Sequence, residues 1–258
     1  MSTIFETDGA LAILTFNRPE ARNAMTWEMY DALVDACERV DRDDRLRVLV
    51  LRGAGGKAFV AGTDIQQFRN FRDREDGLKY EERLDRVLDR LERVGKPTIA
   101  QVQGVAVGGG CAIALVCDLR VATPESTFGI PIARTLGNCL SGATHSRLVD
   151  AIGPSRAKDL LFTGRLIPAP EAYAAGLVNR LADASSIDSL VRGLALEIAV
   201  NAPLTIRASK ELIRRVAVKR RLAAGDDGDM VEMCYTSSDF REGVTAFLEK
   251  RKPTWSGR

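Results

Sequence analysis

The pattern of apolar and polar positions divides the chain into segments with strand-like and helix-like periods. Residues 3–17 carry two short apolar runs around Asp8-Gly9, a pair that favours a tight turn between antiparallel strands. Thr26 is a suitable N-cap for a helix whose apolar residues recur at helical spacing, namely Trp27, Tyr30, Leu33, Val34 and Cys37. Residues 46–53 are mostly apolar and end at glycines, which is typical of a parallel strand buried on both faces.

The middle of the chain alternates between the two patterns. Residues 69–93 are highly charged, but one helical stripe of apolar side chains runs through them, formed by Leu84, Val87, Leu88 and Leu91. Residues 97–104 and 118–122 are predicted strands on either side of a buried helix over 108–117. A weaker strand pattern follows at 177–181.

The pattern changes after about residue 184, where helical segments follow one another without strands. These segments cover 186–200, 203–220, 225–238 and 239–250. Pro203 is well placed at the start of the second, because proline is tolerated in the first turn of a helix. We therefore predict an α/β core over residues 1–190 and a helical C-terminal region over 191–258.

Composition and charge narrow the classes of function. The net charge is +2 and the basic cluster Lys219-Arg220-Arg221 is short, so the sequence does not favour nucleic-acid binding. No apolar run reaches the about 18 residues of a membrane helix, and no signal peptide is recognisable. Five cysteines without C-x-x-C spacing and a single histidine favour reduced thiols and no metal site. We therefore expect a cytoplasmic protein without nucleic-acid or membrane partners.

Three familiar ligand or catalytic motifs are incomplete. Residues 53–57 end in Gly-Lys but lack the first glycine and the Ser or Thr of a phosphate-binding loop. The glycines at 108–110 do not follow the G-x-G-x-x-G spacing of dinucleotide-binding proteins. Ser141 and His145 are four residues apart and could share a helix face, which leaves a Ser–His hydrolase as a minor hypothesis without a third member.

Two glycine-containing turns stand out as candidate chemistry. Residues 58–65 and 104–118 both contain a turn that follows a buried strand and opens a predicted helix. Two such turns from neighbouring strands can aim two backbone N–H groups at one point, which is how an oxyanion hole is built. The alternative is that the glycines serve only close packing of the two turns.

Six segments spread along the chain carry a pattern that is specific when taken together. They are residues 14–26 (LTFNRPEARNAMT), 57–65 (KAFVAGTDI), 97–122, 128–131 (FGIP), 162–179 and 247–253 (FLEKRKP). Through these segments the sequence resembles the crotonase (enoyl-CoA hydratase/isomerase) superfamily over essentially its full length. The resemblance implies a spiral of repeated ββα units with C-terminal helices that support trimers, often paired as hexamers. It also implies an acyl-CoA thioester as substrate, and no cofactor besides the coenzyme A that the substrate carries.

The resemblance also implies roles for individual residues. The backbone N–H groups of Thr63 and Gly109 would form the oxyanion hole for the thioester carbonyl. Arg22 is a candidate to pair with a phosphate of coenzyme A, and solvated surface is the alternative for this side chain. The positions that match the rest of the CoA-binding surface are Ala21, Ala24, Ala61, Asp64, Ile65, Phe247 and Lys250.

Two positions depart from the family pattern. Hydratases of this family hold a water between two glutamates, and the matching residues here are Ala112 and Ile132, which cannot transfer protons. We take His145 as the candidate acid or base, because its ordinary pKa suits proton transfer near neutral pH. The alternative is a helix residue bonded away from the site. Other candidates are Arg134, Thr135, Asn138, Cys139, Ser141 and Thr144, and the carboxylates of Glu75, Glu81 and Glu82.

These observations predict an enzyme of the enoyl-CoA hydratase/isomerase type that stabilises an enolate of an acyl-CoA thioester. The expected chemistry is a proton shift or the addition of water at an enoyl thioester. One alternative is decarboxylation or another enolate reaction, which needs the oxyanion hole more than a pair of proton carriers. Another is a catalytically silent acyl-CoA-binding subunit.

Overall fold

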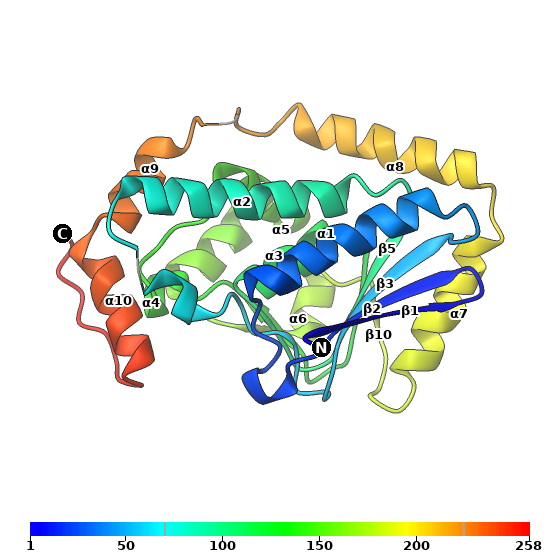
Figure 1. Cartoon of the computed structure of the whole chain (residues 1–258), viewed down its shortest axis with the longest axis horizontal. Helices are drawn as coiled ribbons and strands as arrows, with labels where there is room; N and C mark the ends of the chain where they lie inside the picture. Colours follow the sequence, from blue (N-terminus) through cyan, green and yellow to red (C-terminus); the bar gives the residue numbers. More distant parts are fainter. Residues whose placement is uncertain (70, 224) are drawn as a thin grey trace.

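The computed structural model of the chain describes residues 1–69, 71–223 and 225–258 (Figure 1). Its first two strands form the predicted hairpin. β1 (Thr3–Asp8) lies antiparallel to β2 (Leu11–Phe16), and Gly9 in the turn has a φ of +57°. A left-handed backbone conformation of this kind favours glycine, which explains why Asp-Gly marks the turn.

The larger sheet is parallel from β2 onward. It continues with β3 (Val48–Gly53), β5 (Thr98–Val102), β7 (Leu119–Ala122) and β10 (Arg180–Leu181) in the order β1-β2-β3-β5-β7-β10. These four strands confirm the apolar runs read from the sequence. Most of their residues are buried, as expected for a parallel sheet covered on both faces.

A smaller sheet accompanies the larger one. It contains β4 (Ala58–Val60), β6 (Val105–Val107), β8 (Thr127–Gly129) and β9 (Ile167–Pro168), of which the first three are parallel. Consecutive strands β3 and β4, β5 and β6, and β7 and β8 belong to different sheets, and helical segments follow each pair. The repeated ββα unit is therefore present. The sequence pattern did not reveal this sheet, because strands of two or three residues show no period.

Helices follow each pair of strands. A 3-10 helix, η2 (Ile65–Phe68), and then α2 (Arg74–Glu92) follow the first pair, and α3 (Gly109–Val116) follows the second. The other helices of this part are η1 (Pro19–Ala21), α1 (Trp27–Arg42), α4 (Ile132–Thr135), α5 (Gly142–Thr163) and α6 (Ala169–Ala174). The two halves of α5 meet at a kink where Gly153 has a φ of +76° before Pro154.

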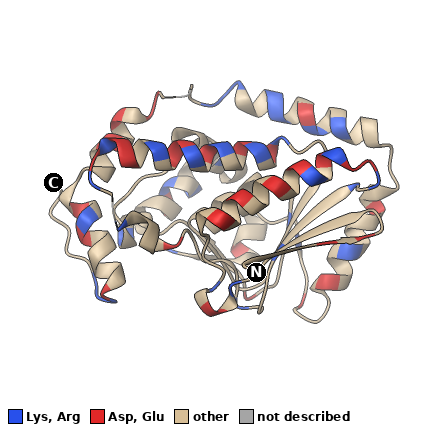
Figure 2. Ribbon diagram, in the orientation of Figure 1, with Lys and Arg blue, Asp and Glu red and all other residues tan. Residues whose placement is uncertain are grey.

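Helices α1 and α2 pack against each other and show clear amphipathic patterning (Figure 1). Thr26 caps α1 by accepting the N–H of Met29, as predicted. The predicted apolar stripe of α2 is buried, while acidic and basic residues alternate on its outer side (Figure 2). There Glu75 pairs with Lys79, and Glu82 pairs with Arg86, in exposed i,i+4 ion pairs.

A buried arginine closes the C-terminal end of α3. The guanidinium of Arg120, on β7, donates to the carbonyl oxygens of Ala114, Leu115, Cys117 and Leu177. Carbonyls in the last turn of a helix lack partners within it, and a positive charge there opposes the helix dipole favourably. Arg120 therefore satisfies this helix end in the interior and fixes α3 against β7.

The C-terminal region is helical, as predicted, with α7 (Ile187–Ala199), α8 (Pro203–Val218), α9 (Gly228–Tyr235) and α10 (Ser238–Leu248). Apolar residues of α7 pack against the larger sheet, so the boundary predicted at residue 190 falls within a helix that covers the core. α8 has no buried residue and runs along one edge of the molecule, whereas α9 packs against α2 at the other end (Figure 1). Within the described residues, no single helix is long and apolar enough to cross a membrane. Of the described helices, only α7 and α8 taken together have the required length and composition, and they are bent by 104° where they meet.

Candidate active site

An apolar cavity of about 120 Å³ lies where the chain leaves β4 and β6. The two glycine-containing turns line it together with residues of α2, α3 and α4, the loop before α5, and Phe247 from the end of α10. Because β4 and β6 are neighbouring parallel strands, their carboxyl ends lie side by side and bring the two turns together.

The two turns touch each other closely. A Cβ atom on Gly108 would lie 3.6 Å from the Cα of Gly62, and both glycines have positive φ. A Cβ atom on Gly109 would lie 3.2 Å from Thr63 Oγ1 and 3.7 Å from the Thr63 amide nitrogen. On Gly110 it would lie 2.1 Å from the carbonyl oxygen of Val60. Close packing, the alternative explanation of the glycines, therefore accounts for Gly110, and it also brings the amides of Thr63 and Gly109 near one another.

Thr63 and Gly109 both line the cavity, and neither amide N–H has a protein acceptor among the described residues. The residues around Thr63 use their backbone groups elsewhere: Gly62 accepts from the N–H of Met25, and Asp64 donates to the carbonyl of Met25. Gly109 is the first residue of α3, so its N–H has no acceptor within the helix. Two residues that line one apolar cavity thus each have an amide N–H without a protein acceptor among the described residues, an arrangement suited to an oxygen that gains negative charge.

The side chain of Thr63 is held by two buried tyrosines. Thr63 Oγ1 lies 2.8 Å from the hydroxyl of Tyr30 on α1 and 2.9 Å from that of Tyr80 on α2. Burial raises the pKa of both phenols, so both hydroxyls stay neutral. This chain of hydroxyl groups fixes the turn after β4 against two helices.

The segment around η1 is tied to the same turn. The Arg22 carbonyl accepts the N–H of Ala61, which adds to the two bonds between Met25 and the turn. The buried Asn23 accepts the N–H of Arg18 and donates to the carbonyl oxygens of residues 54 and 58. Arg18 also pairs with Asp64 at 3.2 Å. These bonds hold Arg22 and Asn23 in left-handed conformations, with the Arg22 side chain exposed.

One carboxyl group faces the cavity. Glu81, on the buried side of α2, is 5% exposed, accepts the Tyr235 hydroxyl at 2.5 Å and accepts the N–H of Ser141 at 3.0 Å. Burial raises its pKa to about 8; the charge of Asp85 also raises it, while the bonds from Tyr235 and Ser141 lower it. Of the three glutamates considered from the sequence, Glu75 and Glu82 lie in exposed ion pairs and only Glu81 lines the cavity.

The buried carboxyl makes stability depend on pH. Between the ordinary pKa of 4.5 and about 8, folded Glu81 keeps a proton that the unfolded chain has lost. Its contribution to the free energy of unfolding therefore falls as pH rises, by at most about 1.4 kcal/mol for each pH unit. We expect Glu81→Gln to lose stability less steeply than the wild type between pH 5 and 8 in urea titrations. Parallel pH curves for the two proteins would contradict this, and Glu82→Gln is the control that should follow the wild type.

The comparisons with known proteins decide the family. The family model described as Enoyl-CoA hydratase/isomerase matches residues 6–258. The chain belongs to the enoyl-CoA hydratase/isomerase family. It is therefore an enzyme that acts on an acyl-CoA, and the resemblance to crotonases read from the sequence is confirmed.

Relatives of this enoyl-CoA hydratase/isomerase family member match along the whole chain. The short-chain-enoyl-CoA hydratase of Clostridium acetobutylicum is 35% identical over 97% of this chain and 96% of its own. The putative enoyl-CoA hydratase of Thermus thermophilus is 37% identical over 95% of this chain and 97% of its own. A methylmalonyl-CoA decarboxylase in complex with 2-nitronate-propionyl-CoA has a TM-score of 0.91 and 29% identity, with 100% of this chain and 99% of that chain covered. These likenesses confirm the crotonase-like α/β fold.

The structure brings most of the predicted binding residues to one region of this family member. Ala61, Ile65 and Phe247 line the cavity beside the two glycine turns. Ala21, Arg22 and Ala24 lie in the segment bonded to the turn, and Asp64 caps η2. Lys250 is exposed just beyond the end of α10.

The two positions that the sequence analysis matched to the glutamates of hydratases both line the cavity. Ala112 on α3 and Ile132 at the start of α4 line it with apolar side chains. Neither side chain can accept or donate a proton. Among the cavity-lining residues that the structure describes, Glu81 is the only one with a carboxyl group.

Ser141 and His145 are not arranged for nucleophilic catalysis. Ser141 is the N-cap of α5 and donates its hydroxyl to Asp85 at 2.7 Å, while His145 Nδ1 lies 3.0 Å from the carbonyl oxygen of Ser141. The hydroxyl and the imidazole therefore do not form the hydrogen bond of a Ser–His pair. His145 is not among the residues lining the cavity, so a role for it as acid or base stays a prediction without geometric support.

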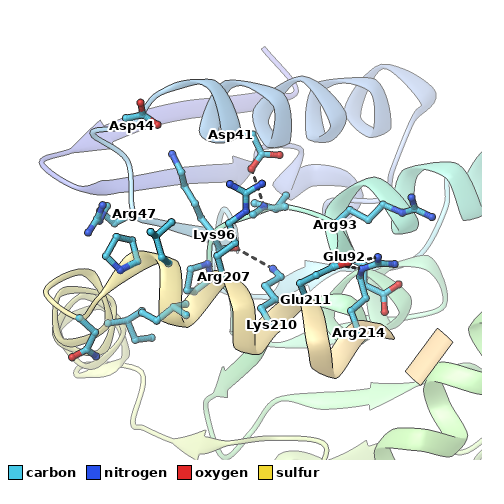
Figure 3. Close-up of a pocket in the computed structure, with 18 of the residues that line it drawn as sticks. Asp41, Asp44, Arg47, Glu92, Arg93, Lys96, Arg207, Lys210, Glu211 and Arg214 are labelled. Carbon is cyan, nitrogen blue, oxygen red and sulfur yellow. Dashed lines mark hydrogen bonds and ion pairs between the residues drawn. The ribbon is translucent and has the colours of Figure 1, made fainter. Parts of the chain in front are cut away.

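A larger, charged pocket lies between α8 and the helices of the core (Figure 3). Neither glycine-containing turn is among the segments that line it. Its ionic side chains are largely used in contacts with each other and with the backbone. Asp41 accepts from Arg90 and from the N–H of Gly95, and Lys210 donates to Asp118 and to the carbonyl of Lys96. Among the described residues, no group of three or more His, Cys, Asp or Glu side chains is placed to hold a metal ion.

Proposed function

We propose that the backbone amides of Thr63 and Gly109 bind the thioester carbonyl oxygen of an acyl-CoA and stabilise its enolate. The observation that carries this proposal is that Thr63 and Gly109 lie close together in the lining of an apolar cavity, each with an amide N–H that has no protein acceptor among the described residues. Preorganised donors in such a site stabilise developing charge, and removal of one donor costs about 3 kcal/mol of transition-state stabilisation. Thr63 is well fixed for this purpose by its hydroxyl bonds to two tyrosines.

In this proposal the acyl group occupies the cavity and the CoA arm leaves it past the 21–24 segment. The cavity volume of about 120 Å³ favours a short acyl chain. The exposed Arg22 and Lys250 are available to the phosphates of coenzyme A, and Phe247 borders the exit with half of its surface exposed.

The reaction we propose is a proton shift that moves the double bond of an enoyl thioester. Ala112 and Ile132 stand where the hydratases of the resemblance carry their two glutamates, so the pair that holds the attacking water is replaced. Decarboxylation is the second candidate. It is favoured by the structural similarity to the methylmalonyl-CoA decarboxylase. It is also favoured by the apolar lining, because a charged substrate carboxylate is unfavourable there and its loss as CO₂ removes the charge.

Four assays test the proposal. We expect calorimetry to detect butyryl-CoA binding, and an absorbance assay to detect conversion of 3-butenoyl-CoA into the conjugated 2-enoyl thioester. Rapid hydration of crotonyl-CoA would contradict a proton shift as the main reaction. Release of CO₂ from methylmalonyl-CoA would favour the second candidate. An absence of all three reactions with binding intact would indicate a binding subunit, and no binding at millimolar ligand would refute the proposal.

We also propose that the protein assembles as a homotrimer or a dimer of trimers. α8 exposes large apolar side chains that a neighbouring subunit would cover, among them Leu204, Leu212, Ile213 and Val216. We expect sedimentation equilibrium to give three or six times the chain mass of 28.1 kDa. Ile213→Asp, at a side chain 70% exposed in the single chain, should reduce that mass. The same charge at the exposed Thr245 of α10 is the control, and a monomeric wild type would refute the assembly.

A cytoplasmic location is a further part of the proposal. All five cysteines are free thiols. Free thiols in this number favour a reducing compartment. Fractionation of cells that produce the protein at natural levels tests this location.

A further inference from the structure

The candidate for a further role is Glu81, which lies on the buried side of α2 and lines the cavity. Its neighbour Glu82 shows the ordinary behaviour of a glutamate on this helix, since its side chain is 69% exposed and pairs with Arg86. Glu81 has no such partner among the described residues, and the charges of Asp85 and Asp227 that raise its pKa are both negative. A buried carboxyl without a cation is unfavourable for stability, so its presence calls for a chemical reason.

Three elements fix the orientation of this carboxyl group. One oxygen accepts the hydroxyl of Tyr235 from α9, and the other accepts the N–H of Ser141 at the start of α5. The Tyr235 hydroxyl in turn accepts from the side-chain amide of Asn138 at 3.1 Å. A carboxylate has about four acceptor positions, so two hydrogen bonds leave it able to take a proton from a ligand in the cavity.

The same cavity contains the two proposed oxyanion donors. Glu81, Thr63 and Gly109 all line it, and Tyr80, the residue before Glu81, bonds to the Thr63 hydroxyl. A thioester held by the two amides would therefore have its carbon atoms in the space that Glu81 borders. The other proton carriers of the hydratases are absent from this space, because Ala112 and Ile132 line it with hydrocarbon.

We infer that Glu81 is the proton-transferring carboxyl of this enzyme and acts on the α-carbon of the bound acyl-CoA. The inference rests on the proposed oxyanion hole. The α C–H bond breaks, its electron pair forms the C=C bond of the enolate, and the proton moves to a carboxylate oxygen of Glu81. Return of that proton to the γ-carbon of a 3-enoyl thioester gives the conjugated 2-enoyl thioester. The reaction consumes no water and no oxidant. Its substrate class is a short 3-enoyl-CoA.

The surroundings of Glu81 place its titration near the pH at which an enzyme works. Its pKa of about 8 leaves both protonation states populated near neutral pH, as a group that takes and returns a proton requires. The titratable and charged groups around it are Tyr30 on α1, Tyr80 and Asp85 on α2, Cys139 before α5, Arg147 on α5, and Asp227 and Tyr235 at α9.

The test compares Glu81→Gln with Glu82→Gln, variants of adjacent residues of α2 of which the first is buried and the second exposed. We expect Glu81→Gln to isomerise 3-butenoyl-CoA at least 100-fold more slowly than the wild type, with a Kd for butyryl-CoA within threefold. Glu82→Gln should stay within twofold in both measurements. Isomerisation by Glu81→Gln within threefold of the wild type would overturn the inference.

A pH profile separates proton transfer from a structural role. The wild-type rate should rise with pH around a midpoint near 8, since the base form of Glu81 starts the reaction. Tyr235→Phe removes a hydrogen bond that lowers the Glu81 pKa, so its midpoint should move to higher pH. A midpoint that Tyr235→Phe leaves unchanged would count against Glu81.

Three further outcomes complete the test. If Glu81→Gln does not fold, Glu81→Asp keeps the charge with a shorter reach, and at least a tenfold slower reaction with unchanged binding supports the inference, while an unchanged rate overturns it. A wild type that binds butyryl-CoA but neither isomerises 3-butenoyl-CoA nor exchanges its α-protons in D₂O overturns the role of Glu81 alone. A wild type that does not bind refutes the proposed function itself.

Discussion

Gly109→Ala is expected to lower kcat for the acyl-CoA reaction by about 100- to 1000-fold, the loss typical of a damaged oxyanion hole. The added methyl group would lie 2.6 Å from the Tyr30 hydroxyl and 3.2 Å from Thr63 Oγ1. It therefore pushes apart the two turns that carry the donors. Steady-state kinetics with 3-butenoyl-CoA measures the effect, and circular dichroism verifies that the variant is folded.

A matched control for this substitution is Gly193→Ala. Gly193 lies in α7, where a Cβ atom would meet nothing within 4 Å, so alanine should leave kcat unchanged and raise stability by up to about 1 kcal/mol. Gly110→Ala is a different case, because its Cβ would overlap the Val60 carbonyl, and we expect it to destabilise the fold. A kcat for Gly109→Ala within threefold of the wild type would refute the oxyanion role of this turn.

Arg120→Met is expected to lower the free energy of unfolding by about 3 kcal/mol or more. Methionine retains much of the buried volume but leaves the carbonyl groups at the end of α3 without donors, and each buried polar group left unpaired costs about 1–3 kcal/mol. Urea titration followed by circular dichroism measures the loss.

The control for this prediction is another arginine that is exposed. The Arg45 side chain is 87% exposed and pairs with Asp43, so Arg45→Met should change stability by less than about 1 kcal/mol. An Arg120→Met variant that loses no more than this control would show that the end of α3 is satisfied in another way.

The parts of the fold that the sequence predicted are those with a long and regular period. The helix over 27–42 and the strand over 48–53 follow from a capping threonine and an apolar run. The sequence pattern did not predict the helix over 142–163, because its buried residues do not form one stripe and Gly153-Pro154 interrupts it. The strands of the smaller sheet were missed because each pairs through only two or three residues, so long-range pairing defines them.

The candidate site was predictable only where backbone geometry defines it. The glycines at 62 and 108–110 mark the two turns in the sequence, because positive φ and the close approach of two backbone segments both favour glycine. The importance of Glu81 was not visible in the same way, because Glu82 beside it is chemically identical. Only the tertiary fold separates the two, through Tyr235, which is 154 positions further along the chain.

The hydrogen bonds between Met25, Arg22 and the 61–64 turn have a consequence for how substrates are discriminated. They join the segment proposed to bind the CoA arm to the segment proposed to polarise the thioester. Contacts made by the nucleotide end of the substrate can then align the reacting end. Thioesters of short thiols such as N-acetylcysteamine, which lack the nucleotide, should accordingly have a lower kcat as well as a higher KM.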